Sequence, residues 1–377
     1  MALTIKPVRS KSEMDMFARL PWKIYKGNKC WVPLLIKDFK DSLNREKNGA
    51  LKKIEFDLFL AFLDNEPAGR IFVGIDNVLN QKKNAKMAHF SLFECIENYE
   101  VAKLLLDTSV NWLKERDIDI IRGPVSPTGT DDDEYKGLLI NCFDKPPALM
   151  NSYNPPYYKE FLERYGFKKD YDLFAYFLDP SVLFAKDPSK AIEFAQKKYN
   201  FRVENIDLNN LEREIRDLKH VLDLAVPEEW ADLVPPSIED VREMAKKLVP
   251  LADPDLIAIA RSGDEAIGFV IALPDYNQVL ARLNGRLTPL AALKFLWYKR
   301  KIDSARVFVL FVVPDFRKKG VSYAIMHHIF KKGVKKGYKY GEGSTIGETN
   351  YSMRNDIESF GGKHYKTYRV FSMKIGE

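Results

Sequence analysis

The sequence predicts an α/β (α+β) protein made of two copies of one domain, and three observations support this class. The chain has 377 residues, which is long for one hydrophobic core and comfortable for two. Hydrophobic residues make up 46% and charged residues 30%, which is ordinary for a globular protein. The order of predicted strands and helices in the first half returns in the second half.

The first half begins with a strand and two helices, and further strands and helices follow. Its predicted strands are short runs rich in β-branched and aromatic residues, at 3–8, 56–64, 67–76, 89–94, 118–124 and 172–179. Its predicted helices carry apolar residues at helical spacing, at 11–25, 34–43, 99–116 and 154–167. Asn65-Glu66 lies between the second and third strands and favours a hairpin turn there.

The second half repeats this order. Its predicted strands lie at 201–207, 306–314, 338–346 and 365–375, and a strand hairpin lies at 254–275. Its predicted helices lie at 211–225, 236–250, 321–337 and 350–362. Pro180 and Pro188 bracket the boundary between the halves. We therefore expect a first domain at 1–180 and a second domain at 190–377.

Cysteine usage and charge narrow the chemistry. Cys30, Cys95 and Cys142 are far apart, and the sequence has no CxxC pair or His/Cys cluster, so we expect no metal site and no disulfide framework. The net charge of +6 is modest, which argues against a nucleic-acid partner. No apolar run approaches the roughly 20 residues of a membrane span, and the first residues lack a signal-peptide pattern. These features predict a cytoplasmic protein without a membrane partner.

A short basic segment in the second half is a candidate anion site. An apolar strand ends at Pro314, and Arg317-Lys318-Lys319-Gly320-Val321-Ser322 follows. A helix that begins near Gly320 would point several backbone N–H groups at one spot, where the helix dipole adds partial positive charge. Gly320 has no Cβ and lets a ligand approach the backbone closely. A solvated basic turn is the alternative interpretation of the same residues.

The pattern Arg317-x-x-Gly320-x-Ser322, after an apolar strand and a proline, resembles the acyl-CoA signature of the GCN5-related N-acetyltransferase (GNAT) family. The resemblance extends over the second half and includes Asn350 at the start of the next predicted helix. It implies two GNAT-like domains, each a mixed, mostly antiparallel sheet flanked by helices and splayed open in the middle. Acetyl-CoA or another acyl-CoA would be the co-substrate and would lie in the gap.

The resemblance also assigns residues to that co-substrate, with the backbone of Phe311 or Val312 polarising the thioester carbonyl. The full set of assigned cofactor residues is Leu310, Phe311, Val312, Arg317, Lys318, Lys319, Gly320, Val321, Ser322, Tyr323 and Asn350.

The sequence departs from the family pattern at three positions. Ser322 stands where Gly or Ala is usual. Ile357 stands where many members have a tyrosine general acid, and Thr345 stands where some have a glutamate base. The proton-transfer groups therefore stay open. Nearby candidates are Glu342, Glu348, Tyr351 and Tyr365.

The first half resembles the family more weakly. At the place of the cofactor motif it has Glu97-Asn98-Tyr99-Glu100-Val101-Ala102, which lacks glycine and carries two carboxylates. A carboxylate repels a pyrophosphate, so we expect a degenerate copy that shapes an acceptor pocket or is structural. Its closing segment, from Asn154 to Gly166-Phe167, keeps the family's spacing.

Three further features are candidates for acceptor binding. Asp131, Asp132 and Asp133 lie in a long loop of the first half and could attract a cationic amine, although a solvated acidic turn is the alternative. A metal site is not favoured, because one contiguous acidic run cannot surround an ion. Tyr153 and Trp230 could line a substrate pocket, with packing as the alternative for both.

Together these patterns predict an acyl-CoA-dependent N-acyltransferase, most simply one that uses acetyl-CoA, acting on a small-molecule or peptide amine. Two alternatives stay open. A non-catalytic CoA-binding sensor or interaction protein is favoured by the missing tyrosine at Ile357. A tRNA-dependent aminoacyltransferase would also pair two such domains, but the nearly balanced charge and the CoA motif argue against it. The sequence carries no signal for the acceptor, the acyl length or the oligomeric state.

Overall fold

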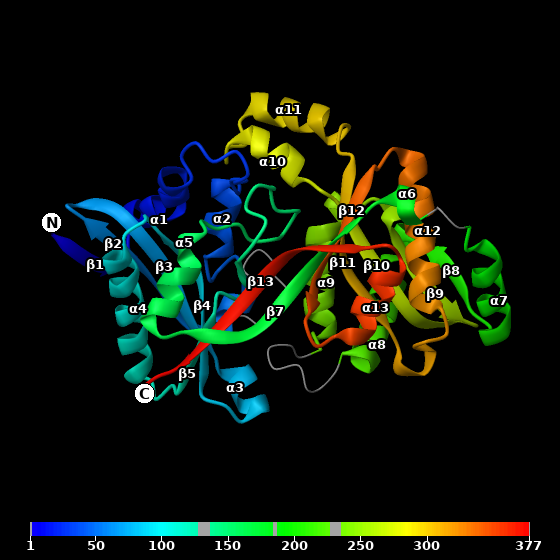
Figure 1. The fold of residues 1–377 in the computed structure, drawn as a ribbon, viewed down its shortest axis with the longest axis horizontal. Coiled ribbons are helices and arrows are strands. Elements are labelled where there is room, and N and C mark those ends of the chain that lie inside the picture. Colours follow the sequence, from blue (N-terminus) through cyan, green and yellow to red (C-terminus); the bar gives the residue numbers. More distant parts are fainter. Residues whose placement is uncertain (1, 127–135, 184–186, 227–234, 377) are drawn as a thin grey trace. The chain divides into compact units, whose positions relative to one another are not determined.

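A computed structural model describes residues 2–126, 136–183, 187–226 and 235–376 (Figure 1). Its contacts divide the chain into two compact units, each made of separate stretches of sequence. Unit 1 comprises residues 1–173, 277–300 and 366–377, and unit 2 comprises residues 174–276 and 301–365. Two of the four borders between the units therefore fall inside strands. The domains expected at 1–180 and 190–377 stay a prediction about the sequence repeat.

Unit 1 contains a sheet with the strand order β1-β2-β3-β4-β5-β13. Its strands are β1 (Leu3–Pro7), β2 (Ile54–Leu63), β3 (Glu66–Asp76), β4 (Met87–Cys95), β5 (Ile120–Gly123) and the second half of β13 (Lys363–Lys374). β4 and β5 are parallel, and the other neighbours are antiparallel. The two-residue strand β6 (Leu138–Leu139) also pairs with β13.

Helices cover both faces of this sheet because its strands alternate apolar side chains between the faces. On β3, Ile71 and Val73 face the core formed with α4 (Tyr99–Lys114) and α5 (Tyr157–Tyr165). Phe72 faces the other core, formed with α1 (Lys11–Ile24) and α2 (Ile36–Ser42). A short α3 (Asn77–Lys83) follows β3.

Two further helices of unit 1 form a hairpin, α10 (Asn277–Leu283) and α11 (Pro289–Lys299). Gly285 between them has a φ of +74°, and a Cβ there would lie 2.3 Å from the Trp22 ring. Its carbonyl accepts a hydrogen bond of 3.0 Å from the Ile36 N–H, and Trp22 donates to Asn284 at 2.7 Å. The hairpin is therefore fixed to α1 and α2 at its turn.

In unit 2 the strands follow the order β7-β12-β11-β10-β9-β8. Its strands are the second half of β7 (Lys168–Leu178), β12 (Tyr340–Gly347), β11 (Ser304–Val312), β10 (Glu265–Pro274), β9 (Ile257–Ser262) and β8 (Arg202–Asn205). β11 and β12 are parallel, whereas β8, β9, β10 and β11 pair antiparallel in turn.

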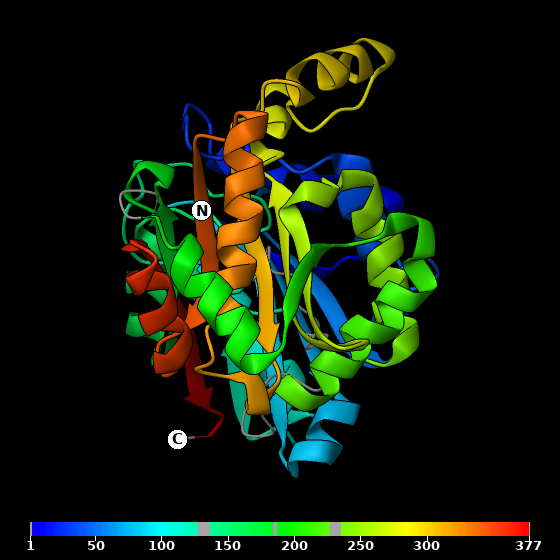
Figure 2. The same ribbon diagram turned by 90° about the vertical axis from the view of Figure 1, so that its right-hand side faces the viewer.

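The helices of unit 2 are α6 (Pro180–Leu183), α7 (Ser189–Tyr199), α8 (Leu211–Ala225), α9 (Ile238–Leu248), α12 (Val321–Lys336) and α13 (Tyr351–Ser359). In Figure 2, α12 (orange) lies on one side of the strands, and α8 and α9 (yellow-green) lie on the other. Within the described ranges, no helix combines the length and apolar character needed to cross a bilayer.

The predicted elements correspond closely to the observed ones. The expected strand at 3–8 is β1, and the expected helix at 321–337 is α12. The predictions missed the helices α3, α6, α7, α10 and α11, and the short β6 inside the expected loop. Asp131, Asp132, Asp133 and Trp230 lie outside the described residues.

Candidate active site

The parallel strand pair of unit 2 opens along its length. β11 and β12 pair where Ser304–Val307 faces Tyr340–Gly343, and β11 continues from there to Val312. Val313 donates its N–H to Ile267 of β10 at 2.9 Å. Bonded residues alternate along an antiparallel ladder, so Val312 turns its main-chain groups away from β10. The geometry therefore favours Val312 over Phe311 as the predicted oxyanion donor, a role that stays a prediction.

The predicted anion turn has the backbone shape that such a site needs. Gly320 has a φ of +79° and immediately precedes α12, and Lys318 has a φ of +61°. The N-terminus of this 16-residue helix lies at the turn, as a phosphate site requires. A Cβ on Gly320 would lie 3.4 Å from the Cβ of Ala195 on α7, so α7 covers the glycine on one side.

The side chains of the turn bind the protein itself. Arg317 donates to the carbonyl oxygens of Val312 at 3.2 Å and Ala225 at 2.9 Å. The Ser322 hydroxyl donates to the Asp356 carboxylate at 2.7 Å. The backbone therefore fits an anion, whereas Asp356 places a negative charge beside Ser322 that a pyrophosphate would have to tolerate.

Other predicted cofactor residues have structural contacts. Lys319 lies 4.9 Å from the ring centroid of Phe316. Tyr323 packs on Phe360 with 4.1 Å between ring centroids. The Asn350 side chain accepts from the Met353 N–H at 3.2 Å, which caps the start of α13. Leu310 lies on the open part of β11, and Val321 is buried.

The structure joins two of the catalytic candidates named from the sequence. The Tyr365 hydroxyl donates to the buried carboxylate of Glu342, which also accepts from Ser344 at 2.5 Å. Tyr351, by contrast, is 66% exposed, and Glu348 is half-buried.

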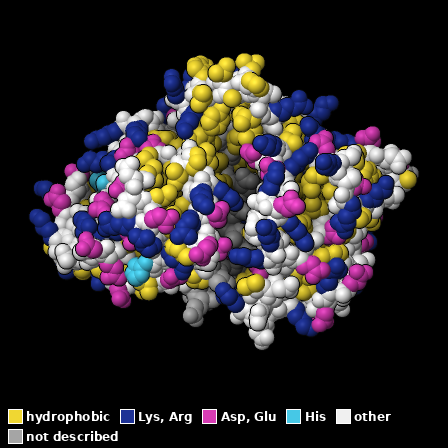
Figure 3. All heavy atoms as spheres, turned by 180° about the vertical axis from the view of Figure 1, so that it is seen from behind, with side chains coloured by type: hydrophobic (Ala, Val, Ile, Leu, Met, Phe, Trp, Pro, Cys, Tyr) yellow, Lys and Arg dark blue, Asp and Glu magenta, His cyan; other side chains and the backbone are white. Residues whose placement is uncertain are grey.

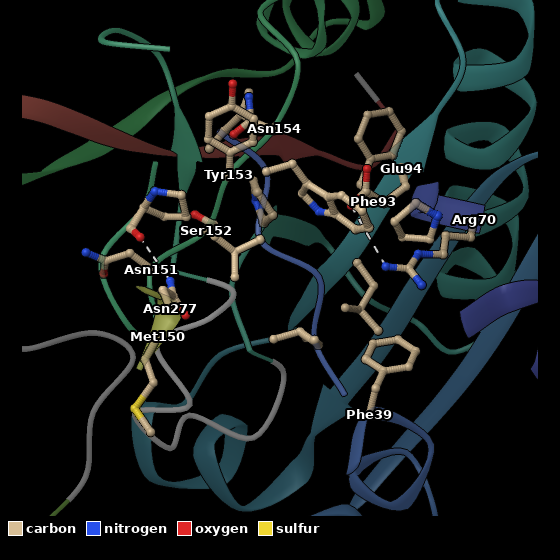
Figure 4. A pocket seen from close by; sticks show the side chains of 18 of the residues that line it. Phe39, Arg70, Phe93, Glu94, Met150, Asn151, Ser152, Tyr153, Asn154 and Asn277 are labelled. Carbon is tan, nitrogen blue, oxygen red and sulfur yellow. Dashed lines mark hydrogen bonds and ion pairs between the residues drawn. The ribbon is translucent and has the colours of Figure 1, made fainter. Parts of the chain in front are cut away.

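Unit 1 opens in the same way and encloses a cavity of about 120 Å³ (Figure 4). β4 and β5 pair where Met87–His89 faces Ile120–Arg122, and β4 continues to Cys95. The lining includes aromatic and aliphatic side chains of α1, α2 and the segment between them, among them Trp22, Trp31, Leu34 and Phe39. Tyr153, predicted to bind substrate, also lines this cavity, and its hydroxyl donates to the Phe143 carbonyl at 2.8 Å.

Glu94, near the end of β4, is the polar centre of this cavity. Its Oε2 lies 2.9 Å from the Tyr25 hydroxyl and 2.8 Å from the Tyr158 hydroxyl. Its Oε1 lies 3.9 Å from the Arg70 guanidinium, as Figure 4 shows. Arg70 donates to the Phe17 carbonyl at 2.6 Å and lies over the rings of Phe17 and Phe39. Glu94 comes from β4, Arg70 from β3 and Tyr158 from α5, and Tyr25 is the C-cap residue of α1.

Burial raises the pKa of the Glu94 carboxyl above its usual range, and the Arg70 charge and the two tyrosine hydroxyls only partly oppose this. Burial likewise raises the pKa of Tyr25 and Tyr158 well above their usual values, helped by the negative charge of Glu94. Both phenols therefore stay protonated near neutral pH. A carboxylate with a raised pKa, at the wall of a cavity, is suited to take a proton from a bound group.

The first-half equivalent of the predicted oxyanion position is occupied. Cys95 of β4 donates its N–H to the Tyr158 hydroxyl at 2.8 Å. Its carbonyl accepts from Tyr157 at 2.8 Å. Val312 of β11 is the equivalent of Cys95. Each is the ninth residue of its strand when the count begins at the first residue of the parallel pairing, Ser304 in β11 and Met87 in β4. The tyrosines of α5 therefore fill the strand end that unit 2 leaves open.

The sequence reasoning did not single out Glu94, Arg70 or Tyr25 as site residues. A usable signal was present at Glu94. This carboxylate interrupts the otherwise apolar end of His89–Cys95, where it would have to be buried or functional. Within the described ranges, no group of three or more His, Cys, Asp or Glu side chains could hold a metal ion.

Solved structures establish the fold class. The fold matches a tandem GNAT protein from the clavulanic acid biosynthesis pathway, at a TM-score of 0.57 and 10% identity. The match spans 100% of this chain and 99% of that protein. The GCN5-related glucosamine N-acetyltransferase region of a fungal multi-domain GH3 β-N-acetylglucosaminidase covers 99% of this chain at a TM-score of 0.58 and 15% identity, and the match spans 38% of that chain. This chain therefore has the tandem GNAT-like fold, as the sequence predicted.

No protein-family model matches the chain, but two curated proteins match along nearly its full length. A bacterial ceramide synthase from Caulobacter vibrioides is 28% identical over 99% of this chain and 98% of its own length. Protein YghO from Escherichia coli is 26% identical over 98% of this chain and 95% of its own. The fold and the ceramide synthase relative together point to acyltransferase activity.

Proposed function

We propose that this protein is an N-acyltransferase that joins an acyl group from acyl-CoA to the primary amine of a long-chain amino alcohol. The observation that carries the proposal is the unit 1 cavity, where the Glu94 carboxylate, with only 13% of its side chain exposed, lies among apolar side chains. A ceramide is the amide of a long-chain amino alcohol with a fatty acid, so the ceramide synthase relative supports this acceptor class. The acetyl donor expected from the sequence would then be replaced by a longer acyl-CoA.

The cavity suits an amphiphilic amine for a simple reason. A long-chain amine has a cationic head and an apolar tail. The Glu94 carboxylate would attract the head, and side chains such as Trp22, Leu34 and Phe39 would contact the first carbons of the tail. A small polar sugar amine would leave these apolar side chains without a matching surface.

Glu94 has a defined role in this proposal. The ammonium must lose a proton before its nitrogen lone pair can attack, and Glu94 accepts that proton. Tyr25 and Tyr158 hold the carboxylate in place through Oε2, and Arg70 limits the rise of its pKa. The acyl-CoA supplies the activated thioester carbonyl. The C–N bond forms as the C–S bond breaks, and the thiolate of CoA leaves. The nitrogen then gives up a second proton, which balances the proton that the thiolate takes up to form CoASH.

For the donor we keep the proposal that the unit 2 turn holds the CoA pyrophosphate. Its support is the backbone shape at Lys318 and Gly320 and the open end of β11. Two observations favour an alternative in which unit 2 does not bind CoA. These are the Ser322–Asp356 hydrogen bond and the closeness of Ala195 to Gly320. Direct binding of CoA decides between them.

An assay with the purified full chain tests the activity. Long-chain amino alcohols and glucosamine are offered with acyl-CoAs of short and long chain, and amide products are measured by mass spectrometry. We expect amides of the long-chain amine, and Glu94→Gln should lower turnover about 10²–10⁴-fold because it removes the proton acceptor. The control is Tyr157→Phe, which loses the hydrogen bond from the Tyr157 hydroxyl to the Cys95 carbonyl, next to Glu94 in the chain. This variant should retain most activity. Unchanged turnover in Glu94→Gln would sink the assignment.

A further inference from the structure

We propose that α11 docks on the surface of an anionic lipid bilayer. Five large apolar side chains on and just before this helix are 53–66% exposed. They are Leu287, Leu290, Leu293, Leu296 and Trp297. Figure 3 shows hydrophobic side chains gathered over this region, at the top of the view. Large apolar patches of this kind mark interaction surfaces.

The exposed side chains share one face of the helix. At about 100° per residue, the four on α11 cover an arc of roughly 120°. The opposite side contains Ala291, Phe295 and Tyr298, which are half-buried. Arg282 of α10 lies 4.5 Å from the centroid of the Tyr298 ring, so this side faces α10. The apolar arc therefore points outward because the other side of α11 packs on its hairpin partner.

The charge of the hairpin identifies the partner. Residues 276–302 contain six basic side chains and no acidic one. These are Arg282, Arg286, Lys294, Lys299, Arg300 and Lys301. The formal net charge of the whole chain is also +6, so the remainder of the chain is balanced. An anionic surface is complementary to this one segment.

A bilayer surface matches both properties at once. A helix lying in the interface buries leucine and tryptophan among the acyl chains while lysine and arginine reach the headgroups. An anionic protein would match the charge but would need its own apolar patch of the same outline. The expected absence of a membrane partner rested on the lack of a spanning segment, and a helix that lies on the surface needs none.

The α10–α11 hairpin contacts the wall of the unit 1 cavity, so docking of α11 would also position this cavity. Trp22 and Leu34 line the cavity and also contact the hairpin turn at Asn284 and Gly285. A docked α11 would therefore hold the cavity wall near the bilayer, where a long-chain amine resides. This last step rests on the proposed function, whereas the docking itself does not.

Vesicle sedimentation of the full chain tests the docking without any turnover. We expect binding to vesicles that mix phosphatidylcholine with phosphatidylglycerol, weaker binding to phosphatidylcholine alone, and loss at high salt. Leu290→Glu combined with Leu293→Glu should lower the partition coefficient at least tenfold, and each charge removed, beginning with Lys294→Gln, should lower it about fivefold. The tryptophan fluorescence of the chain should shift to the blue on binding, and this shift should be lost in Trp297→Phe.

The matched control is Phe194→Glu, an equally exposed aromatic residue (65%) on α7 in unit 2, which should bind vesicles as the wild type does. Two outcomes would overturn the proposal. One is the absence of binding to anionic vesicles by a folded wild-type chain. The other is a self-associated wild type that Leu293→Glu converts to monomers without any vesicle binding, since the face would then join two copies of the chain. Vesicle binding with no acylation would leave the docking standing and remove the proposed function.

Discussion

At the scale of single residues, Glu94 has a cost and a use. A charged carboxylate at the end of a buried strand is unfavourable, and its raised pKa expresses this cost. Arg70 and the hydroxyls of Tyr25 and Tyr158 keep the charged form accessible. A group that ionises closer to neutral pH than an ordinary glutamate is a better proton acceptor there, because proton transfer is most efficient when the pKa lies near the working pH.

The direction of this pKa shift predicts the pH dependence of the activity. Glu94 must be ionised to take the proton, so the acidic limb of kcat should fall at a pH above the usual glutamate value. The sign for stability follows from the same shift, since a folded-state pKa above the unfolded one favours folding at low pH and this stabilisation is lost as the pH rises through the folded value. A pH series of kcat measures the limb. In a partly active Glu94→Asp variant the limb should move, and an identical limb would contradict the role of Glu94.

Residue patterns also set the limit of what the sequence could disclose about the site. The end of the strand at Val312 and the turn at Gly320 could be located from the sequence, since a strand end and a glycine are local features. Glu94 was not combined with Arg70 and Tyr25, because these residues lie far apart in the chain and meet only through the β3–β4 ladder and the packing of α1. Asp356 meets Ser322 across 34 residues for the same reason.

At the scale of elements, many strands were predictable because their nearly continuous runs of β-branched and aromatic residues reflect burial on both faces of the sheet. Helix α11 was missed because its leucines are exposed, so its apolar residues do not follow the pattern of a helix packed on a core. Helix α7 was missed because it contains no fully buried residue. Elements held by few core contacts leave the weakest pattern in a sequence.

The two ends of α12 allow a matched test of CoA binding. Gly320 precedes this helix and Gly337 follows it, and both have positive φ. Glutamate at either position strains the backbone, but only Gly320→Glu would also place a carboxylate at the proposed pyrophosphate site. We expect Gly320→Glu to lower the affinity for CoA at least tenfold, or about 1.4 kcal/mol, with Gly337→Glu close to wild type, as measured by calorimetry. Equal loss in both variants would point to strain alone, and no CoA binding by the wild type would remove the donor site.

At the scale of the whole molecule, the compact units interleave along the sequence. The repeat could be predicted because both halves have the same order of elements. That order does not show that β7 and β13 are each divided between the two units. Leu173 and Phe174, neighbours in β7, are assigned to different units, and so are Tyr365 and Lys366 in β13. Such a division depends on long-range contacts, for which a single sequence gives no direct evidence.

The division predicts different consequences for two phenylalanines only eleven residues apart in the chain. Phe371 is fully buried in the core of unit 1, and Phe360 is buried in the core of unit 2. Replacing either by alanine should cost about 3–5 kcal/mol through lost contacts and the cavity left behind. Hydrogen exchange should show reduced protection mainly in unit 1 for Phe371→Ala and mainly in unit 2 for Phe360→Ala. The same pattern for both would argue that the chain unfolds as one body.

The position of β13 also sets the order of events during synthesis. The strand pairs with β5 through Phe371 to Lys374, so the sheet of unit 1 gains this strand only after those residues have left the ribosome. Most of unit 1 is made first, yet it waits with an open strand edge while the residues of unit 2 are translated. An exposed edge invites pairing with other chains. The edge of β5 is therefore covered only after β13 has been synthesised. Slow translation between β5 and β13 would lengthen the interval in which the edge of β5 is open.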